Sequence, residues 1–112
     1  MATAKELEEA ICNWYWQETG KDASYLDDAA DYFLDTIEGN PVELDEIGKV
    51  VWITTEGGEG QGDQYFGVFS VGTQFFRLDG FWNSWDGVSW EGASLYEVVP
   101  KQVTITQYVA KK

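Results

Sequence analysis

The sequence predicts an α+β fold in which two N-terminal helices pack on a four- to five-stranded antiparallel meander sheet. Up to residue 46, apolar side chains recur at the three- and four-residue spacing of helices. After Gly48 they gather in short β-branched and aromatic runs separated by glycine-rich turns. A length of 112 residues fits one domain, so we expect a single unit with an acidic helical part at 1–46 and a sheet part at 47–112.

A first helix is predicted over residues 4–18. Thr3 and Glu6 match a capping box, and Gly20 offers the left-handed conformation that ends many helices. The apolar stripe of this helix consists of Leu7, Ile11 and Trp14. Cys12 lies in the same apolar pattern, so we expect it to be a core thiol.

A second helix is predicted over residues 25–38. Ser24 and Asp27 repeat the start signal, and the run Gly39-Asn40-Pro41 ends the helix. On a helical wheel, one side is apolar and consists of Leu26, Ala29, Ala30, Phe33, Leu34 and Ile37. The other side carries five acids, which we call the acidic ridge: Asp27, Asp28, Asp31, Asp35 and Glu38. We expect the ridge to face outward.

The remaining chain predicts up to five strands. They cover residues 50–55, 65–71, 75–81, 95–99 and 103–109, and the last of them alternates as a half-exposed edge strand does. Gly72 and Thr73 fit a two-residue hairpin with glycine at the first central position. Residues 56–63 fit a longer glycine-rich hairpin loop.

Negative charge is concentrated in the helical part. Residues 1–46 hold 13 of the 20 acids and two lysines, whereas residues 47–112 hold seven acids and five bases. Like-charged neighbours four residues apart, such as Asp27, Asp31 and Asp35, each cost a helix about 0.2–0.5 kcal/mol. Asp35 and Glu38 also oppose the helix dipole. Stability alone therefore does not explain the ridge.

Three interpretations of the ridge remain open. It is a solvated face that keeps the protein soluble, or it docks on a basic protein and imitates the phosphate spacing of nucleic acid. The third interpretation is cation binding or self-association. Glu43, Asp45 and Glu46 follow the helix and extend the candidate partner-binding surface.

Common catalytic and metal chemistry is missing from the composition. The chain has no histidine and one cysteine, which leaves no disulfide and no credible zinc or iron–sulfur ligand set. Carboxylate chemistry is the main enzymatic option, and Asp79, Asp86, Glu91 and Glu97 lie near tryptophans as a glycosidase would need. A chain this short leaves little material for a cleft. We expect a non-catalytic protein without metal or cofactor.

Three tryptophans, Trp82, Trp85 and Trp90, fall within nine residues of the segment 80–92. In one interpretation the segment folds back as a hairpin whose rings cover the open end of the core. In the other it is an interface hot spot. Stacking on nucleic acid is disfavoured because seven bases face 20 acids in the whole chain.

The sheet part resembles a group of small acidic proteins encoded by tailed phages. The motifs that carry the resemblance are Tyr65-Phe66-Gly67-Val68-Phe69, Phe75-Phe76-Arg77, Gly80-Phe81-Trp82-Asn83-Ser84-Trp85-Asp86-Gly87, Trp90, Glu97-Val98-Val99-Pro100-Lys101 and Val103-Thr104-Ile105. The resemblance covers roughly residues 50–109 and implies an infected bacterial cytoplasm as the setting. That group has no assigned activity, so the resemblance implies no site residue. Where the group has Tyr-x-Ser-Tyr, this chain has Trp82 and Trp85.

Together these patterns predict an acidic phage accessory protein that binds a basic, nucleic-acid-handling host protein through the acidic ridge. We expect a cytoplasmic protein, because the first residues resemble no signal peptide and no run is apolar enough to span a membrane. The alternative is a structural, homo-oligomeric protein that associates through the 103–109 edge and the tryptophan segment. A third hypothesis is carbohydrate or small-ligand binding on the tryptophans.

Overall fold

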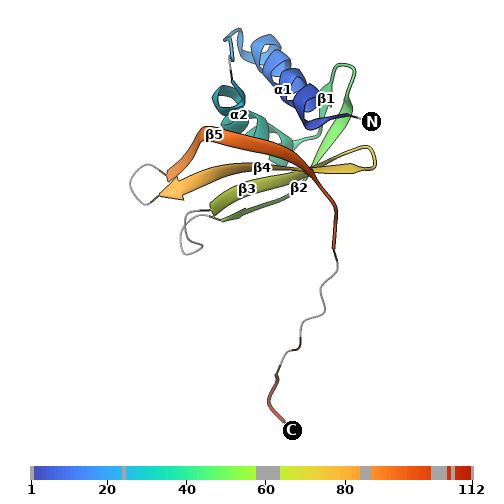
Figure 1. Ribbon diagram of the computed structural model, residues 1–112, viewed down its shortest axis with the longest axis vertical. Helices are drawn as coiled ribbons and strands as arrows, with labels where there is room; N and C mark the ends of the chain where they lie inside the picture. Colours follow the sequence, from blue (N-terminus) through green and yellow to red (C-terminus); the bar gives the residue numbers. More distant parts are fainter. Residues whose placement is uncertain are drawn as a thin grey trace.

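The computed structural model confirms two N-terminal helices followed by an antiparallel sheet (Figure 1). It describes residues 2–23, 25–57, 64–83, 87–101, 106 and 108–111. The elements are α1 (Ala4–Thr19), α2 (Leu26–Gly39), β1 (Val42–Leu44), β2 (Gly48–Gly57), β3 (Gln64–Val71), β4 (Gln74–Asn83) and β5 (Gly87–Val98). Both predicted helices are present, and each ends one residue later than the sequence predicts.

α1 begins with the predicted capping box. The Thr3 hydroxyl oxygen accepts from the Glu6 amide at 3.1 Å, and the Glu6 carboxylate accepts from the Thr3 amide at 3.0 Å. The latter hydrogen bond, from the Thr3 backbone, lowers the pKa of Glu6. At the other end Gly20 has φ of 72° and its amide donates to the Trp16 carbonyl oxygen. The cap residues therefore fix both ends of α1 as predicted.

α2 begins one residue later than its predicted start signal. Tyr25 is the N-cap, and its amide donates to the Asp28 carboxylate at 3.3 Å. Asp28, rather than Asp27, is therefore the first-turn acid that satisfies an otherwise unpaired backbone donor. Ser24, the predicted cap, lies outside the described residues.

The five strands form a simple meander in the order β1-β2-β3-β4-β5. Val50 on β2 pairs with Val71 on β3, and Leu78 on β4 pairs with Leu95 on β5. Val71 also pairs with Gln74, so the two-residue hairpin is confirmed, with Gly72 at φ of 61°. The register shifts at two irregularities, in β2 and near the middle of β4. The predicted loop at 56–63 falls mostly on residues 58–63, which lie outside the described residues.

Two strands differ from the sequence prediction. β1 was assigned to the helical part, yet it pairs with β2 and buries Val42 and Leu44. β5 begins at Gly87 instead of residue 95, because β4 and β5 remain paired through most of the tryptophan segment. The predicted strand at 103–109 is not formed at its described residues, Thr106, Tyr108 and Val109, and its other residues lie outside the described chain.

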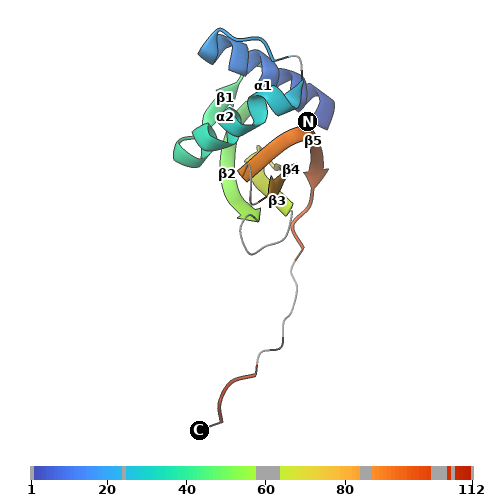
Figure 2. The same ribbon diagram turned by 90° about the vertical axis from the view of Figure 1, so that its left-hand side faces the viewer.

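The core lies between the helices and one face of the sheet, as Figures 1 and 2 show from two directions. Phe33 of α2 is fully buried and packs edge to face on Phe69 of β3, with ring centroids 5.6 Å apart. Trp14 of α1 packs on the same Phe33 ring at 5.3 Å. No described helix or strand covers the opposite face of the sheet (Figure 2).

Candidate functional site

The acidic ridge of α2 faces outward. Asp28, Asp31, Asp35 and Glu38 are exposed and Asp27 is half-buried, while the apolar side of α2 is buried. Partial burial, followed by the charges of Asp31 and Glu38, raises the pKa of Asp35. The carboxylates of the ridge therefore repel one another, and nothing on α2 offsets that repulsion.

The ridge lies beside the end of the sheet formed by Tyr65 of β3 and Trp90 of β5. Burial raises the pKa of Tyr65, and the charges of Glu38, Asp35 and Asp31 raise it further. The Trp90 indole Nε1 donates to the Asp31 carboxylate at 3.2 Å. The Trp90 and Tyr65 rings meet edge to face, with centroids 5.6 Å apart. One carboxylate of the ridge is thus held against the sheet, whereas Asp35 and Glu38 form no hydrogen bond or ion pair with the residues that the structure describes.

At the other end of α2 the acids face Cys12 of α1. Cys12 is half-buried rather than part of the deep core that the sequence predicts. Burial raises the pKa of the Cys12 thiol, and the charges of Glu8, Asp28 and Asp27 raise it further. Since the thiolate is the reactive form, this environment makes Cys12 a poor nucleophile.

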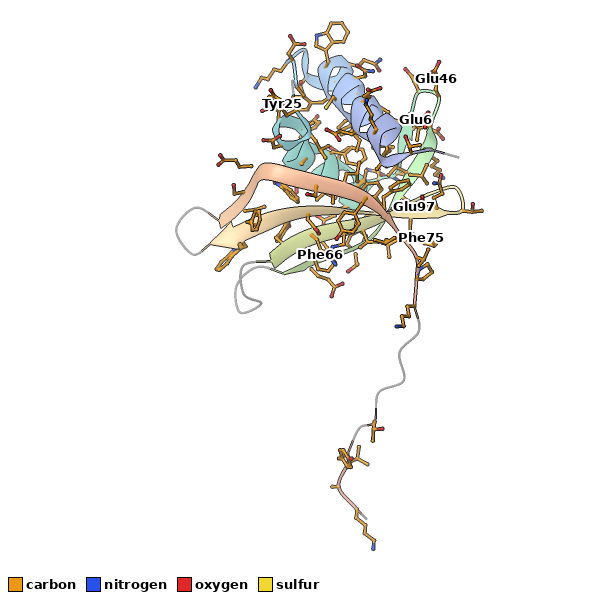
Figure 3. The ribbon with its side chains drawn as sticks, in the orientation of Figure 1. Glu6, Tyr25, Glu46, Phe66, Phe75 and Glu97 are labelled. Carbon is orange, nitrogen blue, oxygen red and sulfur yellow. The ribbon has the colours of Figure 1, made fainter. Side chains whose placement is uncertain are left out.

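Glu43, Asp45 and Glu46 belong to a second acidic surface, which we call the acidic groove. They lie on β1 and the β1–β2 turn and, with Glu6 and Glu9 of α1, line a groove of about 400 Å³. Figure 3 shows Glu6 and Glu46 on the two sides of this groove.

The acidic groove also holds an exposed aromatic side chain. Trp16 of α1 lines the groove and is 56% exposed. The sequence analysis did not single out Trp16, Glu6 or Glu9 as site residues. Helix geometry could have identified Trp16 from the sequence. Trp16 lies about 200° from Trp14 around α1, so the two rings do not share one apolar face.

The ion pairs of the described chain leave both acidic surfaces uncompensated. The one ion pair among those residues joins Arg77 to Asp79 on β4, at 2.5 Å, on the face of the sheet away from the helices. Among the described residues, no three acids or thiols converge as metal ligands. The acids of the ridge and of the groove, which together we call the acidic helical layer, are therefore spread over a surface and are not gathered at a point.

The tryptophan segment divides between core and surface. Trp90 is buried and lies against Gly80, so it is a core residue and is not available as a binding surface. Trp82 is half-buried on β4, and Trp85 lies outside the described residues. The buried ring of Trp90 agrees with the interpretation of this segment as a hairpin that covers the core. It also removes Trp90 from any platform for stacking on a sugar.

No protein-family model, curated protein or solved structure matches the chain. Within the described parts of the chain, neither helix combines the length and apolar character that crossing a bilayer requires. The candidate site is accordingly defined by its geometry and charge alone.

Proposed function

We propose that this protein is a non-catalytic binding protein whose acidic helical layer docks on a basic protein. One observation carries the proposal: the exposed acids of α2 and of the groove have no basic partner among the described residues. Such a layer attracts a positively charged surface over several ångströms and accelerates encounter with it.

The acidic groove supplies the anchor for such a partner. A lysine or arginine side chain is long enough to lay its aliphatic stem along Ile47 and to place its cationic head among the groove carboxylates. The exposed Trp16 ring lies at the same groove and offers a cation–π contact, worth about 0.5–1 kcal/mol at exposed sites. The ridge then adds attraction without a shaped pocket.

The partner we propose is a nucleic-acid-handling protein, because its basic surface already accepts a regular row of negative charges. Asp27, Asp31 and Asp35 rise about 6 Å per step along α2. The resemblance to tailed-phage proteins would place this encounter in an infected bacterium, where the protein would block a host enzyme or regulator.

The test is a pull-down from bacterial lysate with the tagged full chain at low and high salt, followed by mass spectrometry and a purified binding assay. We expect a basic protein that is captured at low salt, is released at high salt and is displaced by a nucleic-acid oligomer. The variants Asp35→Lys with Glu38→Lys, and Glu43→Lys with Glu46→Lys, should each weaken binding about tenfold or more. Asp31 is spared because it also bonds to Trp90.

Glu97→Lys is the matched control. Glu97 is exposed on β5 opposite Phe76, so it lies outside the ridge, the groove and the sheet face away from the helices, and its reversal changes the net charge as each single substitution does. Binding that falls equally in Glu97→Lys would reduce the proposal to a nonspecific charge effect. Binding that survives both double variants would remove the helical layer from the mechanism.

A further inference from the structure

The face of the sheet away from the helices is apolar, and we call it the open face. Strand alternation places Val51, Phe66, Val68, Phe75 and Phe81 on this side, and Ile53 lies at the register shift of β2 between Trp52 and Thr54. Val51 is 38% exposed on β2, and Phe81 is 56% exposed on β4. Figure 3 shows Phe66 on the side of the sheet opposite the helices.

An antiparallel sheet that faces water on one side normally carries polar side chains there. Here Phe69 of β3 points inward, whereas Val68 and Phe66 on the same strand point outward and are also apolar. Strands that are apolar on both sides are typical of sheets that are covered on both faces. Contiguous apolar patches on a surface are typical of interfaces.

Three polar side chains on the open face satisfy one another. Arg77 pairs with Asp79, and the Tyr96 hydroxyl donates to the other carboxylate oxygen of Asp79 at 2.8 Å. The Arg77 guanidinium also lies over the Phe66 ring, 3.6 Å from its centroid. This cluster carries no net charge and already has its partners, so covering it leaves no unpaired charge behind.

We propose that the open face is a homodimer interface and that its occupant is the open face of a second copy of this chain. Charge selects this occupant. The net charge of the chain is −13, and residues 1–46 carry most of it on the helical side. Among the surfaces described, the open face brings the fewest acids together: Asp79, which pairs with Arg77, and Glu56, which lies opposite Phe66.

Geometry keeps the repulsion between the two copies small. Two sheets pack about 10 Å apart, and a helix adds about 10 Å on each side, so the two acidic layers would lie on the order of 30 Å apart. The Debye length at physiological salt is about 8 Å, so repulsion over that distance is largely screened. The dimer would leave both helical layers exposed, so this inference does not depend on the proposed function.

The size of the open face also fits a dimer. Four strands about 4.8 Å apart and about eight residues long span roughly 500 Å² in projection, and side-chain relief makes the accessible area larger. A standard interface buries about 800 Å² per partner. In a two-fold dimer, the same patch of each copy meets the other. The polar cluster near the middle of the patch is neutral and its members bond to one another, so two copies of it can face each other without repulsion.

Sedimentation velocity and light scattering on the full chain, over a wide concentration range, test this inference. We expect a dimer for the wild type. Val51→Lys on β2 and Phe81→Lys on β4 should each weaken dimerisation about a hundredfold, because each places a lysine in the interface of both copies. Both side chains are exposed in the single chain, so circular dichroism should show an intact fold.

Tyr25→Lys is the matched control, since Tyr25 is 71% exposed on the helical side. It should leave the dimer unchanged. A wild type that is monomeric at every concentration would overturn the inference and would make another occupant, such as the chain beyond Val98, the cover of the open face. A dimer that tolerates both lysine variants would also overturn it, because its interface would then lie elsewhere.

Discussion

The two outer surfaces of this domain differ in how their charges are arranged. The helical layer exposes many acids, and none of them forms an ion pair with a described base. The open face exposes apolar and aromatic side chains around one satisfied cluster of Arg77, Asp79 and Tyr96. One surface therefore keeps its electrostatic interactions available for another molecule, whereas the other has completed them internally.

That difference separates two kinds of recognition. Uncompensated charge acts at a distance, is weakened by salt and speeds encounter. Apolar area acts on contact and is much less sensitive to salt. A single protein that carries both surfaces on opposite sides of one core would, under the two proposals, pair with a copy of itself and with a basic partner at the same time.

The largest expected effect comes from breaking the packing of the sheet beneath both surfaces. A Cβ added at Gly80 would lie 2.5 Å from Cε3 of Trp90 and 2.9 Å from the Ser89 carbonyl oxygen. Backbone does not give way easily, so we expect Gly80→Ala to lower the free energy of unfolding by about 3 kcal/mol. Urea denaturation followed by tryptophan fluorescence measures it.

Gly67→Ala is the matched control for that variant. Gly67 also lies on the inner face of the sheet, but the three atoms nearest to its added Cβ all belong to the side chain of Leu34, with Cδ2 at 2.6 Å. A leucine side chain moves more readily than a backbone carbonyl, so the cost should be about 1 kcal/mol. Equal costs would show that the contact with the β5 backbone does not limit the packing at Gly80.

A smaller effect should follow from breaking the hydrogen bond between the sheet and the acidic ridge. Trp90→Phe removes the Nε1 donor, and Asp31→Ala removes the acceptor. A double-mutant cycle of these two substitutions should give a coupling energy of about 1 kcal/mol. Zero coupling in thermal and urea unfolding would mean that Asp31 behaves as a free member of the ridge, like Asp35.

The fold was largely predictable because its signals are local. The caps at Thr3 and Gly20 and the two-residue turn at Gly72 act within a few residues, and each appears in the structure. β1 was missed because three residues are too few to establish a period. Its strand character comes from pairing with β2, which a local pattern does not contain.

The site was less predictable because it depends on contacts between elements that are distant in the sequence. The sequence indicated that Glu43, Asp45 and Glu46 are acidic, but packing of α1 against β1 brings Glu6, Glu9 and Trp16 to the same groove. The density of tryptophans left open whether Trp90 covers the core or lies on a binding surface, and the missing side chain of Gly80 makes room for its ring in the core. The open face was also missed, since apolar strands read the same whether one or both faces are covered.

The smallest effect concerns the position of charge along the ridge. At neutral pH, Asp35→Asn should stabilise the protein by about 0.2–0.5 kcal/mol, because it removes repulsion from Asp31 and Glu38. Asp28→Asn should destabilise it by about 0.3–0.5 kcal/mol, because Asp28 lies in the first turn of α2, where the helix dipole favours negative charge. The two substitutions are chemically identical, so each controls for the other.

The sign of the pH dependence of Asp35 follows from its raised pKa. The folded protein holds the Asp35 proton more tightly than the unfolded chain, whose aspartate pKa is about 3.9. Stability from this group is therefore present below about pH 3.9 and is lost as the pH rises through the higher folded value. The gain in Asp35→Asn should appear above that window, vanish below it and shrink in high salt.

Thermal unfolding at several pH values and two salt concentrations measures these shifts of about 1–3 °C. If Asp28→Asn and Asp35→Asn shift the melting temperature in the same direction, the helical layer responds to the number of its charges and not to their places.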